Sequence, residues 1–187
     1  MVMYVVLAIV VVAVLFAVGI FNSLVGLRVR ADNAWSDIDV QLKRRHELIP
    51  NLVETVRGYA SHERETLQAV VDARNRAAAT TAPAERAQAE GVLTQALRQV
   101  FALAEAYPQL RAVESFTQLQ AQLAQIEDAI QNARRYYNAV VRDLNTQVAQ
   151  FPSSLIAGTF GFSPRTFFEL DDSAERQSPK VSFSTRA

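Results

Sequence analysis

The pattern of apolar positions divides the chain into two parts. The first 21 residues contain no charged side chain and consist mainly of Val, Leu, Ile, Ala and Phe. A helix of about 20 apolar residues spans the roughly 30 Å hydrocarbon core of a bilayer, so this run predicts a transmembrane helix. The competing interpretation is a cleaved signal peptide. The run has no basic start, exceeds the usual apolar length of such peptides and is not followed by a small-residue cleavage site.

From Leu24 onward, apolar residues recur every three or four positions, which is typical of a helix that faces a packing partner. This seam extends to Tyr59 but contains Ile49-Pro50. Proline removes a backbone donor and clashes with the preceding turn, so the helix should kink or end there. We favour an end, with a second helix that starts at Pro50 and runs to about Ala79.

Two more helices are predicted farther along the chain. The third has Pro83 in its first turn and ends where Pro108 follows Tyr107. The fourth has the most regular stripe, in which apolar residues alternate in steps of three and four from Phe116 to Phe151, as in helical bundles and coiled coils. No segment alternates with a period of two. The sequence therefore predicts an all-α protein with an N-terminal transmembrane helix.

The segment 151–168 contains five of the ten phenylalanines, among Ser, Pro and Gly. It is too rich in helix breakers for a long helix, and we expect it to fold back over one end of the bundle rather than to form an exposed docking motif. From Leu170 the chain is polar and aperiodic, which predicts a disordered tail at 170–187. Trp35, the single tryptophan, lies on the seam, and we expect it to pack in the core.

Charge narrows the range of partners. Lys plus Arg and Asp plus Glu both number 19, so the formal net charge is zero. This balance argues against nucleic acid as a partner, because phosphate binding needs a basic excess. The absence of cysteine excludes disulfides and thiol nucleophiles. Arg28 and Arg30 are the first charged side chains after the span, so the positive-inside rule places the bulk of the chain in the cytoplasm.

No catalytic, cofactor-binding or metal-binding residues emerge from the sequence. His46 and His62 each precede a glutamate, but neither has the second histidine that an H-E-x-x-H zinc site needs. The E-x-x-H tetrapeptide of di-metal bundles does not occur either. Paired carboxylates such as Asp37 and Asp39 point to different sides of a helix. We therefore expect a protein without enzymatic activity and without a cofactor.

The densest basic cluster is the run from Lys43 to His46. On a straight helix it lies roughly 35 Å beyond Phe21, whereas attraction to charged lipid fades over about 10 Å. We therefore expect it to pair with acidic residues or with a second copy, while Arg28 and Arg30 flank the membrane. The candidate interaction surface combines this cluster with nearby and aromatic residues: Lys43, Arg44, Arg45, His46, Pro50, Asn51, Phe160, Phe162, Phe167 and Phe168.

Several segments together resemble the LemA family of bacterial membrane proteins. The resemblance extends from the N-terminus to about residue 169. Its clearest motifs are AWSDIDVQLKRRHELIPNLV at 34–53, GYASHE at 58–63, EAYPQLRA at 105–112 and ARRYYN at 133–138.

The resemblance implies a transmembrane anchor at 1–23, a LemA-like antiparallel up-and-down four-helix bundle at 24–169, and the tail. It favours a chain reversal at Pro50 over a kink, and it implies a bacterial cytoplasmic membrane location. Relatives are associated with a membrane metalloprotease of the HtpX type, and one branch with building magnetosome membranes. The resemblance supplies no catalytic residue.

The functional hypothesis is a non-enzymatic, membrane-anchored helical scaffold or assembly protein. It would contact the bilayer through residues 1–21, form homo-oligomers and help to organise membrane. The alternative is an adaptor for a membrane protease of the HtpX type, with contacts through 43–51 or the phenylalanine-rich segment.

Overall fold

In the computed structural model, which describes residues 1–169, the chain is almost entirely helical and the described part contains no strand. Helix α1 extends without interruption over Val2–Arg57. At 1.5 Å per residue it is about 84 Å long. The predicted end at Pro50 is therefore wrong, because the helix passes through this residue and the second helix starts only at Arg64.

A side chain of the next helix explains why Pro50 is tolerated. Proline has no N–H, so the carbonyl of His46, four residues earlier, lacks its usual helical donor. Arg74 donates from its Nε to this carbonyl oxygen at 3.3 Å. The ring of Pro50 lies on the exposed side of α1 and displaces no core residue. The missing hydrogen bond is thus replaced through tertiary structure, and the helix continues to Arg57.

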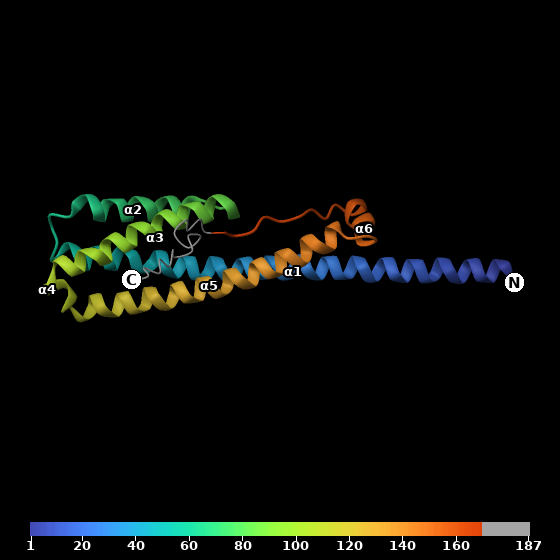
Figure 1. The fold of residues 1–187 in the computed structure, drawn as a ribbon, viewed down its shortest axis with the longest axis horizontal. Coiled ribbons are helices and arrows are strands. Elements are labelled where there is room, and N and C mark those ends of the chain that lie inside the picture. Colours follow the sequence, from blue (N-terminus) through green and yellow to red (C-terminus); the bar gives the residue numbers. More distant parts are fainter. Residues whose placement is uncertain (170–187) are drawn as a thin grey trace, which may run out of the picture.

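Helices α2, α3 and α5 lie along α1 in Figure 1, and the short turn α4 joins α3 to α5. The predicted end of the second helix near Ala79 and the predicted third helix are confirmed, and α5 covers most of the expected last stripe. The bounds are α2 Arg64–Ala79, α3 Pro83–Ala106, α4 Pro108–Arg111, α5 Glu114–Ala149 and α6 Ser153–Thr159.

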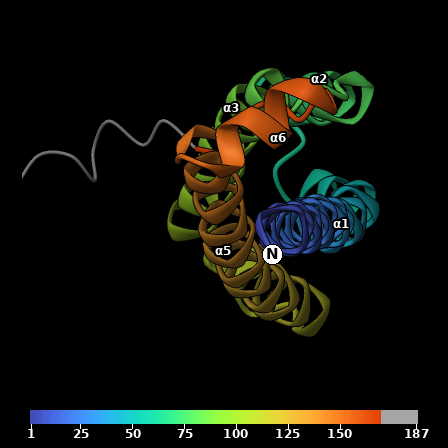
Figure 2. The ribbon, with the colours of Figure 1, turned by 90° about the vertical axis from the view of Figure 1, so that its right-hand side faces the viewer.

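Packing between helices is unequal. The most extensive contact joins α1 to α5, and the next joins α2 to α3, while α2 also packs against α1. In the end-on view of Figure 2, α3 and α2 lie on one side, and α1 and α5 on the other. The regular apolar stripe predicted for α5 is therefore used mainly inside the chain, against α1.

The predicted seam of α1 is confirmed as its buried face from Leu24 to Val56, although Tyr59 is exposed because the helix has ended. The buried apolar residues form two clusters. One lies around Leu52, Leu93 and Phe116, and the other around Ile38 and Leu144. Trp35 packs against the second cluster as expected, with ring centroids 5.5 Å from Tyr137 and 5.4 Å from Phe168.

The N-terminal part of α1 projects beyond all the other helices (Figure 1). Its 18-residue apolar window has a mean hydropathy of 3.1, and none of that window is buried by the rest of the chain. The first fully buried side chain is Leu24. A helix this apolar and uncovered is long enough to cross a bilayer, which fits a membrane protein.

The C-terminal segment folds back as expected, although its route differs from a simple end cap. Helix α6 packs against both α1 and α5. The chain then returns alongside the bundle in extended form (Figure 1), where two asparagines of α5 hold it. Asn145 bonds to both the N–H and the carbonyl of Arg165, and Asn138 does the same with Phe168, at distances of 2.8 to 3.1 Å. The predicted disordered tail, 170–187, lies outside the described residues.

Candidate functional site

A cluster of polar and charged side chains lies inside the molecule, between the two apolar clusters. Arg45 and His46 of α1 are 1% and 5% exposed, and Glu90 of α3 is fully buried. Arg45 donates from one terminal nitrogen to Oε2 of Glu90, and Nε2 of His46 lies 2.9 Å from Oε1. Both carboxylate oxygens are thus engaged.

Two competing effects set the charge on Glu90. Burial disfavours the ionised form and raises its pKa. The hydrogen bond with His46 and the positive charge of Arg45 act in the opposite direction and outweigh burial, so the pKa of Glu90 lies below its ordinary value. The carboxylate is therefore ionised at neutral pH and compensates the charge of a buried arginine.

The cluster extends to a third helix. The other terminal nitrogen of Arg45 lies 2.8 Å from Oε2 of Glu127 on α5 and 3.3 Å from the hydroxyl of Thr94 on α3. One guanidinium therefore connects α1, α3 and α5, although its Nε has no hydrogen-bond partner. We call Arg45, His46, Glu90, Thr94 and Glu127 the polar layer. It lies between the two apolar clusters, where any sliding of one helix would separate the charges.

A second ionic bridge joins α1 to α3 next to the polar layer. Arg86, which is 8% exposed, approaches one oxygen of Asp39 at 2.7 Å, and Lys43 approaches the other at 2.7 Å. Partial burial raises the pKa of Asp39. The hydrogen bonds and charges of Lys43 and Arg86 lower it by more, so the pKa of Asp39 lies below its ordinary value. Arg86, Glu90 and Thr94 are spaced four residues apart and form one polar stripe along α3.

The expected surface around 43–51 is only partly on the surface. Lys43, Arg44, Pro50 and Asn51 are exposed. Arg45 and His46 lie in the interior instead, which corrects their assignment to a surface patch. The reason is helical geometry, because positions 42, 45, 46 and 49 share one face at about 100° per residue. Partner binding by the four exposed residues stays a prediction.

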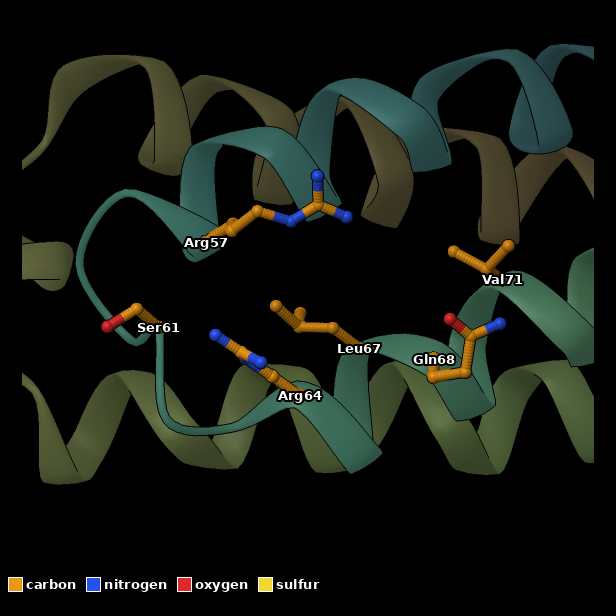
Figure 3. Close-up of a pocket in the computed structure, with 6 residues that line it drawn as sticks. All are labelled: Arg57, Ser61, Arg64, Leu67, Gln68 and Val71. Atoms are coloured by element: carbon orange, nitrogen blue, oxygen red, sulfur yellow. The ribbon is translucent and has the colours of Figure 1, made fainter.

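A groove between α1 and α2 lies beside the exposed part of this surface. Two neighbouring cavities of about 440 and 210 Å³ share Arg57 and Val71. Figure 3 shows the larger one, which Leu67 enters from α2 while Arg57 borders it from α1. The smaller is lined by Pro50 and Arg74. The groove thus combines an apolar floor with a mainly basic rim. The rim contains three arginines and one acidic residue: Arg57, Arg64, Arg74 and Glu54.

The four candidate phenylalanines separate into two pairs. Phe162 and Phe168 are buried, so they serve packing rather than recognition. Phe160 and Phe167 remain exposed, and Phe160 also contacts Phe21. The sequence could not distinguish these pairs, because the chain leaves α6 through a turn at Phe160 and then runs extended, so no helical period applies to them.

The two predicted membrane-flanking arginines are both exposed. The guanidinium carbon of Arg28 lies 5.1 Å from the ring centroid of Phe162, within the range of a cation–π interaction. Arg30 donates from Nε to the carbonyl of Gly26 at 3.4 Å. A role at lipid headgroups stays a prediction for both residues.

Sequence reasoning missed the members of the polar layer outside α1. The spacing of Arg86, Glu90 and Thr94 was a usable signal, because a polar stripe with a period of four points in one direction. Glu127 carried no such signal. Among residues 1–169, no group of three or more His, Cys, Asp or Glu side chains is arranged to hold a metal ion.

Comparison with known proteins gives consistent matches. The model of the LemA family matches residues 34–183. Protein LemA of Metamycoplasma hominis is 27% identical over 144 residues, which cover 75% of this chain and 64% of that protein. Magnetosome proteins MamQ 1 and MamQ 2 of Paramagnetospirillum magneticum are each 28% identical over 81 residues, covering 43% of this chain and 30% of each relative. The chain therefore spans less than two thirds of these curated relatives.

Proposed function

This chain belongs to the LemA family, and from that premise we propose that it is a non-enzymatic scaffold that holds a helical bundle on a bacterial cytoplasmic membrane. One observation carries the proposal. The uncovered apolar helix and the longest core helix are the same element, α1. Without a flexible linker, the anchor and the bundle move as one body. Similarity to two magnetosome proteins supports a scaffold role, because their name refers to a cellular structure and not to a reaction.

The proposed bundle is an antiparallel, up-and-down arrangement of α1, α2, α3 and α5. The contacts of α1 with α5 and α2, and of α2 with α3, support it. The polar layer would fix the relative height of the helices, since charged groups in a core tolerate only one register. The far end near Arg57 would then stand about 50 Å from the membrane surface, at 1.5 Å per residue from Phe21.

We propose that the bundle faces the cytoplasm, on the basis of Arg28 and Arg30. Because the chain has no cysteine, a single cysteine placed at exposed Val92 reports its side of the membrane. The Val92→Cys protein in intact cells should react with a membrane-impermeant maleimide only after permeabilisation. Labelling of intact spheroplasts would show that the bundle lies on the opposite side of the membrane. Recovery of the protein in the soluble fraction would contradict the transmembrane anchor.

Self-assembly is part of the proposal, but it needs a surface other than the α5 stripe, which is engaged by α1. The uncovered apolar helix at 2–18 is the largest candidate. Light scattering of the detergent-solubilised full chain, across a range of concentrations and corrected for bound detergent, measures its copy number. A strict monomer at every concentration would overturn this part of the proposal.

The second candidate function is that of an adaptor for a membrane protease, and the groove between α1 and α2 favours it. Its apolar floor and arginine-rich rim suit an acidic amphipathic segment of a partner. A photoreactive residue at exposed Gln68, in the groove, should crosslink to a membrane protease in native membranes. The matched control is exposed Gln99 on α3. Self-crosslinks alone, or equal yields at both positions, would contradict the adaptor role.

A further inference from the structure

Two stretches of the chain that meet where the apolar run ends contain no charged side chain. No charged side chain occurs before Arg28, and none occurs over the 21 residues from Leu144 to Pro164. Figure 1 places these stretches together, since α6 lies beside α1 where α1 leaves the other helices. Two segments far apart in the sequence thus create one uncharged region.

Helix α6 is fixed at a definite level along α1. The rings of Phe21 and Phe160 have centroids 4.8 Å apart, and those of Phe21 and Phe162 are 5.8 Å apart. Ile156 and Ala157 face the same apolar cluster, against which Ile20 of α1 also packs. Because these contacts involve the last residues of the apolar run, α6 is level with the point where that run ends.

The outer face of this segment remains apolar and uncovered. Phe151, Leu155 and Phe160 are 75%, 63% and 58% exposed. These are large side chains, and the other exposed residues between Phe151 and Phe160 are Gly158 and Thr159, which carry no charge. Such a patch next to a transmembrane helix is unfavourable in water and favourable at the boundary of a bilayer.

The vertical position of the patch matches that boundary. About 20 residues cross the hydrocarbon core, so Phe21 lies at its edge when 2–21 span it. Arg28 lies about 10 Å farther along α1. Arg165, which follows the uncharged stretch, lies 2.6 Å from Asp32 of the same region. The arginines therefore reach headgroup level when the patch is at the acyl boundary.

We propose that 151–160 is a second membrane contact, in which α6 lies in the interface of the bilayer that α1 crosses. The inference rests on the proposed anchor. It selects lipid as the occupant because the patch is continuous with the membrane-crossing surface through Phe21 and because the whole segment lacks charge. Two contacts beside each other would restrict tilting of the bundle relative to the bilayer, because a tilt would lift α6 out of the interface or push it deeper.

Site-directed spin labelling of the full chain tests the proposal, since the protein has no native cysteine. Single labels are placed at Leu155→Cys and Gly158→Cys. A Cβ atom at Gly158 would have no heavy atom of its surroundings within 4 Å, so there is open space for the label to start from. The protein is reconstituted into phosphatidylcholine–phosphatidylglycerol vesicles. Collision rates with oxygen, which concentrates in lipid, and with a water-soluble nickel chelate are compared.

Two further labels serve as controls. Val10→Cys lies in the apolar run, and Val92→Cys is an exposed apolar position on α3, far from the membrane end. Oxygen should dominate at 10, 155 and 158, and the nickel chelate at 92. If position 10 favours oxygen but 155 and 158 behave like 92, the interfacial contact is refuted while the anchor stands.

Low collision rates with both reagents at 155 and 158 would mean that protein covers the patch, whether a second copy or another chain, and would also refute the proposal. If position 10 itself favours the nickel chelate, the anchor has failed. The second contact then fails with it.

Discussion

Replacing Glu90 by glutamine tests the polar layer with the smallest change in shape. The substitution removes the negative charge from a fully buried side chain and leaves Arg45, which is 1% exposed, without its nearest counter-charge. Breaking a buried pair by removing one partner costs about 3 to 5 kcal/mol. Glu127 still lies 2.8 Å from Arg45, so we expect the lower end of that range, about 3 kcal/mol.

Thermal unfolding of the intact protein in nonionic detergent measures this loss. Circular dichroism follows the helices, and Trp35 fluorescence reports the apolar cluster around Ile38 and Leu144. For a chain of this size, about 3 kcal/mol lowers Tm by roughly 6 to 12 °C. Glu54→Gln is the matched control. Its exposed carboxylate lies 3.7 Å from Arg57, and such a surface pair contributes little, so Tm should not change measurably.

A combined replacement separates charge burial from simple loss of contacts. Arg45→Met together with Glu90→Met removes the buried arginine together with its counter-charge, so this variant should be more stable than Glu90→Gln, although His46 and Glu127 each lose a partner. A Tm shift for Glu90→Gln no larger than that of the control would refute the reasoning. So would a combined variant no more stable than Glu90→Gln.

Three further predictions concern pH, the C-terminal segment and the proline. The folded-state pKa of Glu90 is lowered, so its contribution to the free energy of unfolding is present at neutral pH and is lost as pH falls below about 4.5. The free energy of unfolding of Glu90→Gln should therefore change less with pH in that range. Asn138→Ala should release the returning segment, shifting Trp35 emission to the red and accelerating amide exchange, whereas exposed Asn132→Ala should not. Arg74→Ala should lower the free energy of unfolding by about 1.5 kcal/mol, as measured by thermal unfolding. In a Pro50→Ala background the loss should be clearly smaller, because the backbone N–H of residue 50 then bonds to the carbonyl of His46. Equal losses in both backgrounds would contradict the role of Arg74.

Much of the fold could be predicted because local pattern and burial agree. The seam from Leu24 to Val56 became the buried face of α1, and the stripe from Phe116 became that of α5. A period of 3.6 residues determines which side chains share a face, whatever the partner is. The same period does not reveal which helix packs against that face. The stripe of α5 gave no indication that α1 would cover it.

The candidate site was harder to predict. Arg45 and His46 continue the buried face of α1 in steps of three and four from Leu42, yet their charge suggested a surface. Burial of a charge depends on a counter-charge, and here it comes from Glu90, 45 residues away along the chain. No local pattern encodes such a pair. Only the meeting of α1 and α3 decides that the arginine lies inside.

The sequence by itself determined the elements with a local cause: an apolar run long enough for a bilayer, amphipathic helices and the helix boundary near Ala79. Tertiary structure decided whether Pro50 ends a helix, which charges are buried and which phenylalanines remain exposed. The physical reason is the same in each case. In each case the free energy depends on a group that is distant in sequence. Arg74 supplies the donor that Pro50 lacks, and Glu90 supplies the counter-charge of Arg45. Phe21 supplies the apolar contact of the C-terminal segment.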